Sequence, residues 1–205
     1  GGYDTYRYYA GNTLLRSWIC MPLIVGLKER SEGTVRALLG PELMTDDGLL
    51  TQQGSSTFWD RSTLYALRGV YASGETGQAD RATELLHRYS QRRLLGDHVP
   101  YPIEAWPEGS QRHLSAESGL YCRIITEGLF GIRPTGLRSF DLTPSMPAAW
   151  ESMSLRHIRA FGSDFDITVA RVADGRLRIT VARPGAKPKI YRAAPGATIR
   201  VKLTD

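Results

Sequence analysis

The chain of 205 residues contains 41% hydrophobic and 23% charged residues, a composition typical of globular proteins that excludes a disordered or fibrous chain. No apolar run approaches the roughly 20 residues that cross a bilayer, so we expect no membrane span. The formal net charge is +5, but the basic residues are mostly arginines spread along the chain beside acids. This distribution does not favour a nucleic-acid partner.

The cysteines and the known short motifs indicate no metal site. Cys20 and Cys122 lie in apolar stretches with helical spacing, and neither forms a Cys-x-x-Cys pair or stands near a histidine at ligand spacing. Buried free thiols are the favoured interpretation, with a disulfide or a nucleophile as alternatives. The chain contains no Gly-rich phosphate loop and no Ser-His-Asp order, and we expect no cofactor.

Helical periodicity dominates the first part of the chain. Apolar residues from Leu14 to Ile24 recur at helical spacing, with Pro22 as a kink. Further helices are expected over residues 31–39, 62–73, 79–94 and 115–129, with a loop at 45–56 and a turn at 74–77. The connection from Gly96 to His113 contains three prolines and exceeds the usual loop length, which favours a functional role.

Alternation with a period of two dominates the second part. It predicts strands at residues 154–160, 165–172, 176–182 and 198–203, and Asp174-Gly175 predicts a hairpin between two of them. The sequence therefore predicts an α-then-β fold, with helical hairpins at residues 1–131 and a small antiparallel β-sandwich at residues 132–205. Because so few helices would leave apolar faces exposed, we expect them to form part of a larger helical toroid.

One segment combines carboxylates with aromatic rings just before a helix. Its notable members are Tyr101, Glu104, Trp106, Glu108, His113 and Glu117. Aromatic faces can stack on the weakly apolar C–H face of a sugar, and carboxylates supply the acid and base for cleaving a glycosidic bond. The alternative interpretation is that Glu117 only caps the helix, Glu108 lies in solvent and Trp106 covers the core.

This segment resembles a known family. The order Glu104-Ala105-Trp106, then Gly109, then Gln111 to Ala116 is similar to the segment of glucoamylase-type (α/α)6 enzymes that carries their catalytic base. The resemblance implies that Glu104 is the general base.

A second segment resembles the part of trehalases and processing α-glucosidases that lines the sugar subsite. It reads Thr57-Phe58-Trp59-Asp60-Arg61 and is followed by Tyr65 to Gly69. Those enzymes read Trp-Arg-Gly-Pro where this chain reads Trp59-Asp60-Arg61-Ser62, so the arginine is displaced and follows an acid. The substrate-binding residues expected from both segments are Trp59, Asp60, Arg61, Tyr101, Trp106, Glu108 and His113.

A third resemblance concerns the passage from helices to strands. Thr126 to Ile132, through Pro144 and Leu155 to Gly162, is similar to this passage in α-rhamnosidases and disaccharide phosphorylases of the same six-hairpin group. Together the resemblances imply the C-terminal portion of a six-hairpin glycoside hydrolase that acts on oligosaccharides or glycosides by inversion. In such enzymes the general acid lies upstream of the base, which implies that a missing N-terminal half supplies it.

Other functions remain open at this stage. A non-catalytic carbohydrate-binding module would keep the aromatic cleft without the chemistry. A disaccharide phosphorylase would need a phosphate site, toward which Arg112, His113 and Ser115 offer a partial set. The sequence gives neither the sugar, nor the linkage, nor the compartment.

Overall fold

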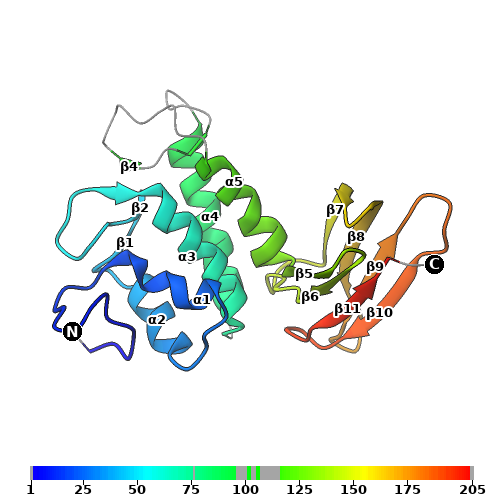
Figure 1. Ribbon diagram of the computed structural model, residues 1–205, viewed down its shortest axis with the longest axis horizontal. Coiled ribbons are helices and arrows are strands. Elements are labelled where there is room, and N and C mark those ends of the chain that lie inside the picture. The colour runs from blue at the N-terminus through cyan, green and yellow to red at the C-terminus, as the bar shows by residue number, and fades with distance from the viewer. Residues whose placement is uncertain (1, 76, 96–100, 103–104, 107–115, 204–205) are drawn as a thin grey trace. The chain divides into compact units, whose positions relative to one another are not determined.

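The chain forms a helical unit followed by a β unit. The computed structural model describes residues 2–75, 77–95, 101–102, 105–106 and 116–203. The chain divides into two compact units, residues 1–128 and residues 129–205 (Figure 1). Helices dominate the first unit and antiparallel strands the second, which confirms the expected α-then-β order.

The helical unit is built around one central helix. In chain order the elements are η1 (Ser17–Cys20, a 3-10 helix), α1 (Met21–Ile24), α2 (Ser31–Leu38), β1 (Met44–Thr45), β2 (Gly48–Leu49), β3 (Phe58–Trp59), α3 (Asp60–Ser73), α4 (Gln78–Leu94), β4 (Ala105–Trp106), α5 (Ala116–Arg123) and the π-helical η2 (Ile124–Leu129). Helix α3 packs against α1, α2, α4 and α5 and buries Leu64, Leu67 and Val70. The core of this unit therefore surrounds α3.

Local hydrogen bonds explain where α3 begins. The hydroxyls of Ser62 and Thr63 donate to the Trp59 carbonyl at 3.1 and 2.8 Å, which ties the first turn to the preceding strand. Asp60 places a carboxylate at the N-terminus, where the helix dipole favours negative charge. Gly74, in the left-handed conformation with φ 74°, ends the helix. The helix predicted at 62–73 thus begins two residues earlier.

The long helix expected from Leu14 to Ile24 is present only as two short helices, η1 and α1, over residues 17–24. Arg16 is extended and forms an isolated β-bridge with Gln52, and only η1 and the short α1 follow. Pro22 lies in the first turn of α1, where its missing N–H costs no intrahelical hydrogen bond. The predicted loop at 45–56 is also interrupted, because β1 and β2 pair as a small hairpin.

The β unit contains two antiparallel sheets. Its strands are β5 (Ile132–Gly136), β6 (Ser139–Leu142), β7 (Ser152–Ala160), β8 (Ser163–Arg171), β9 (Leu177–Ala182), β10 (Lys189–Ala193) and β11 (Ile199–Lys202). One sheet has the order β10-β9-β8-β7 and the other β11-β6-β5. Phe140 of β6 stacks on Phe165 of β8 with ring centroids 5.5 Å apart, so the two sheets share a core.

The four predicted strands correspond to β7, β8, β9 and β11, and the hairpin expected at Asp174-Gly175 joins β8 to β9. Strands β5, β6 and β10 were not predicted. Strand β5 carries Pro134 and Gly136, β6 carries Asp141 and β10 carries Lys189, all residues that are uncommon in strands. Pairing with neighbouring strands outweighs this local preference.

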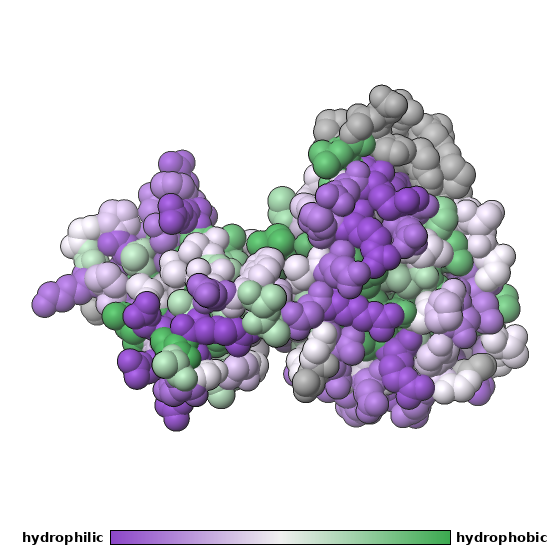
Figure 2. Space-filling model, turned by 180° about the vertical axis from the view of Figure 1, so that it is seen from behind, coloured by the Kyte–Doolittle hydropathy of each residue, from purple (hydrophilic) through white to green (hydrophobic). Residues whose placement is uncertain are grey.

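The surface of the helical unit is polar where α4 meets solvent. Its exposed residues are Asp80, Arg81, Glu84, His87, Gln91 and Arg92, whereas Ala82, Leu86 and Tyr89 are buried. One face of the protein, on which hydrophilic residues predominate, is seen in Figure 2. Among the described residues, no helix has the length and apolar character needed to cross a membrane.

Candidate functional site

A short β-ladder joins the two segments that the sequence singled out. Strand β3 pairs antiparallel with β4, with Phe58 opposite Trp106 and Trp59 opposite Ala105. The same edge continues through the bridge between Leu50 and Phe58. Segments that are far apart in the sequence therefore pair at β3, immediately before the first residue of α3.

Aromatic rings surround this ladder. The Trp18 ring lies edge-on to the Trp59 ring with centroids 4.9 Å apart, and Tyr65 of α3 is 6.1 Å from Trp18. The Arg68 guanidinium lies 5.9 Å from the centroid of the Tyr65 ring. Trp59 is half-buried, so contact with Trp18 orients its ring while part of it remains accessible.

An ion pair connects the start of α3 with the start of α5. Arg61 donates through Nε to Oε1 of Glu117 at 2.7 Å. The Glu117 side chain is fully buried, and in the described part of the chain its Oε2 has no hydrogen-bond partner. Arg61 is 31% exposed, so this buried carboxylate fixes an arginine that still reaches solvent.

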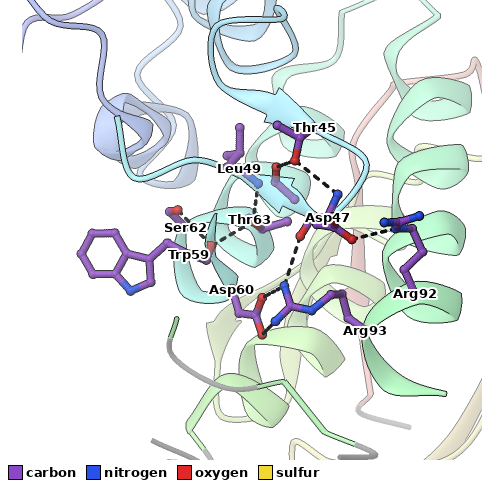
Figure 3. A network of polar contacts seen from close by, with 10 residues as sticks. Thr45, Asp47, Leu49, Trp59, Asp60, Ser62, Thr63, Arg92 and Arg93 are labelled. Carbon is purple, nitrogen blue, oxygen red and sulfur yellow. Dashed lines mark hydrogen bonds and ion pairs between the residues drawn. The ribbon is translucent and has the colours of Figure 1, made fainter. Parts of the chain in front are cut away.

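Asp60 lies in a second, deeper ion pair. Both of its carboxylate oxygens contact Arg93 of α4, with Nη1 at 2.8 Å from Oδ1 and Nη2 at 3.1 Å from Oδ2 (Figure 3). Asp60 is 1% and Arg93 5% exposed. Asp60, expected to bind substrate, instead forms a buried ion pair with Arg93.

This pair belongs to a wider polar network. Arg93 Nη1 also donates to the Asp47 carbonyl at 3.1 Å, and Arg92 Nε donates to the Asp47 carboxylate at 2.7 Å (Figure 3). Burial, together with the negative charge of Asp60, raises the pKa of the Tyr89 hydroxyl well above its ordinary value. The network connects the β1–β2 hairpin, α3 and α4, and the deep burial of its Asp60–Arg93 pair favours a structural role.

The remaining expected site residues are only partly described. Tyr101 is half-buried, and Trp106 is defined by the backbone pairing of β4 alone. Glu104, Glu108 and His113 lie outside the described residues. Their expected roles, including that of Glu104 as general base, remain predictions.

Two residues of this site, Trp18 and Arg93, escaped the sequence interpretation, which places Trp18 on the apolar face of a helix and gives Arg93 no role. Glu117 belongs to the segment that the sequence singles out, as a carboxylate for the chemistry or, in the alternative interpretation, as a helix cap. Neither interpretation includes its ion pair with Arg61. The partners Arg61 and Asp60 are distant in sequence, so nothing local could indicate the pairing.

Comparison of the chain with protein-family models, with curated proteins and with solved structures gave no match. In the described ranges, no group of three or more His, Cys, Asp or Glu side chains is placed to hold a metal ion. The residues of the site are therefore the basis for a functional proposal.

Proposed function

We propose that this chain is the C-terminal portion of an inverting glycoside hydrolase with Glu104 as its general base. The observation that carries the proposal is the pairing of β3 with β4. It sets Trp59 opposite Ala105, the residue that follows Glu104 in the sequence. A sugar site needs an aromatic ring and a carboxylate within one ligand's reach.

Arg61 and the tryptophans support the binding of a sugar. An arginine held by a buried carboxylate offers fixed N–H donors, which suit the hydroxyl groups of a carbohydrate. Trp59, oriented by Trp18, offers a partly exposed ring against which a pyranose can stack. Glu117 acts here as a positioning residue, because it touches Arg61 and is closed to solvent.

The chemistry follows from the geometry of inversion. Glu104 accepts a proton from a water molecule as that water attacks the anomeric carbon. A second carboxyl group protonates the leaving oxygen from across the bond, at roughly 6.5–9.5 Å, which leaves room for the water. The general acid belongs to an N-terminal half that completes an (α/α)6 toroid, and the β unit corresponds to the sandwich that follows the helices in the resembled families.

Activity of the complete enzyme tests this proposal. Glu104→Gln should lower kcat by about 10²–10⁴, because an amide cannot accept the proton of water, while the KM changes little. Glu108→Gln, in the same loop, is the matched control and should be far milder, as should Glu117→Gln. The substrates are a panel of aryl glycosides and oligosaccharides, assayed against the complete enzyme and against residues 1–205 alone.

The outcomes separate the candidate functions. An unaffected Glu104→Gln enzyme, or strong turnover by residues 1–205 alone, would contradict the assigned chemistry. Turnover that requires inorganic phosphate would instead indicate a phosphorylase. Sugar binding without turnover by the complete protein would indicate a binding module.

A further inference from the structure

A cavity outside the site described above lies against the N-terminal segment. It has a volume of about 320 Å³ and opens to solvent within the helical unit. The N-terminal segment (blue in Figure 1) lines it together with Ile19 of η1 and with Glu42 and Gln53, which flank the β1–β2 hairpin. The lining side chains that matter here are Tyr6, Arg7, Asn12, Arg16, Glu42 and Gln53. A volume of this size accommodates one or two sugar rings, and the lining is rich in groups that bond to hydroxyls.

Positively charged side chains outnumber negatively charged ones in the lining of this cavity. Arg7 and Arg16 contribute two positive charges, and Glu42 is the one acid among the lining residues described. Glu42 is already engaged, since its Oε2 accepts a hydrogen bond from the Tyr3 hydroxyl at 2.8 Å. The cavity therefore carries a net positive charge suited to an anion.

Arg16 points to a ligand in a second way. Its Nε is buried, and in the part of the chain that the structure describes no acceptor lies within hydrogen-bonding reach of it. Its guanidinium is oriented by the Tyr8 ring, whose centroid is 5.2 Å away. A buried donor without a protein acceptor is costly unless a ligand or water accepts its hydrogen bond.

The Tyr8 ring beside Arg16 is exposed and contacts a second exposed ring. Tyr8 and Tyr9 are 54% and 57% exposed, and their rings meet edge to face with centroids 6.1 Å apart. Large rings turned to solvent beside an arginine of a polar cavity suit stacking against a sugar. This combination favours an acidic sugar over a free inorganic anion.

Arg16 is also close along the chain to the site at β3. It forms a bridge with Gln52, and Trp18, two residues further along, packs against Trp59.

We propose that this cavity is an accessory subsite for a sugar unit that carries a carboxylate, with Arg16 and Arg7 as its recognition residues. This inference rests on the proposed function, because it names the class of glycan that the same enzyme binds. The carboxylate accepts hydrogen bonds from the guanidinium of Arg16, and Tyr8 or Tyr9 packs against the sugar ring.

Binding of a matched pair of ligands to residues 1–205 tests the inference. The probes are trigalacturonate and its fully methyl-esterified form, which share a carbon skeleton and differ in charge. Calorimetric titration should show the acid binding roughly tenfold or more tightly than the ester. Arg16→Gln should remove most of this preference, Arg16→Lys should keep part of it, and Arg7→Gln should weaken it. Arg176→Gln, an exposed arginine of the β unit, should leave binding unchanged.

The results decide the inference independently of the proposed catalysis. Circular dichroism first confirms that each variant is folded. Equal binding of acid and ester, no binding of either, or an unchanged preference in Arg16→Gln would overturn the acidic subsite. Failure of the proposed hydrolase function would appear elsewhere, as a complete enzyme whose kcat does not respond to Glu104→Gln.

Discussion

Arg61 and Glu117 form an ion pair between the first turns of α3 and α5, with Nε 2.7 Å from Oε1. The carboxylate is fully buried whereas the arginine is partly exposed, so the two partners differ in what their loss would leave behind. Without Arg61, a buried charge would lack its partner. Without the charge of Glu117, Arg61 would still reach water.

Removal of Arg61 should therefore destabilise the helical unit more than neutralisation of Glu117. We expect Arg61→Met to lower the free energy of unfolding by about 2 kcal/mol, below the usual cost for a fully buried pair because Arg61 reaches solvent. Glu117→Gln should cost about 1 kcal/mol, since its amide oxygen still accepts from Nε. Urea unfolding measures both. The double variant Arg61→Met/Glu117→Gln should lose less than the sum of the two single variants, because no unpaired buried charge remains in it, and a loss greater than that sum would contradict this account.

Neighbouring arginines at the end of α4 provide a second comparison. Arg93 is 4% exposed in its side chain and holds Asp60, whereas Arg92 is 49% exposed and pairs with Asp47. Arg93→Met should cost roughly 3–5 kcal/mol, because Asp60 would remain buried and charged without this partner. Arg92→Met should cost far less, because solvent screens an exposed ion pair. Chemical unfolding measures both variants, and similar losses of unfolding free energy would show that burial of the Asp60–Arg93 pair does not increase its contribution to stability.

The fold could be predicted from the sequence where local pattern and local structure coincide. Helices α2, α3 and α4 and the strands of the β8–β9 hairpin follow from periodicity and turn residues. The first helix begins later than the sequence predicts because Arg16 pairs with Gln52, and this contact between distant residues outweighs helical spacing. Strand β10 was missed because its partner β9 determines it, and its own residues Lys189 to Ala193 carry little signal.

The candidate site was predictable in its segments but not in its pairings. The sequence indicated that Trp59 and the stretch around Ala105 lie near one another, and β3 and β4 are indeed paired. It did not indicate that Asp60 would turn inward. Asp60 and Arg61 are adjacent in the first turn of α3, and the pairing of Asp60 with the distant Arg93 determines which of the two side chains is buried.

The two cysteines should differ sharply in reactivity. Cys20 is buried, and burial raises the pKa of its thiol to about 12. At pH 8 its reactive thiolate would be on the order of 10⁻⁴ of the total, since the pH lies about four units below that pKa. Cys122 is exposed. We expect iodoacetamide at pH 8 to label Cys122 in the native protein and both cysteines in urea, as read by mass spectrometry of peptides. Equal native labelling of Cys20 would contradict the burial of η1 against α3.

Two glycines of the β unit separate backbone conformation from steric contact. Gly131 and Gly185 both have positive φ, 66° and 72°, so alanine is strained at either position. A Cβ on Gly131 would lie 2.2 Å from the Thr143 carbonyl oxygen, whereas nothing lies within 4 Å at Gly185.

The backbone around Gly131 cannot move aside cheaply. The Thr143 N–H donates to the Gly131 carbonyl at 3.2 Å, and the Ser145 N–H donates to the Leu129 carbonyl at 2.8 Å. Gly185→Ala should therefore cost about 1–2 kcal/mol from conformation alone, and Gly131→Ala clearly more, because it adds this clash and breaks the hydrogen bonds beside it. Unfolding in urea gives the two losses, and hydrogen exchange of the Thr143 and Ser145 amides shows where the change acts. Faster exchange at these amides is expected only in Gly131→Ala, because Gly185 lies in the turn between β9 and β10 and a Cβ there meets nothing within 4 Å. Equal exchange and equal stability of the two variants would show that the chain just before β5 tolerates a side chain at this contact.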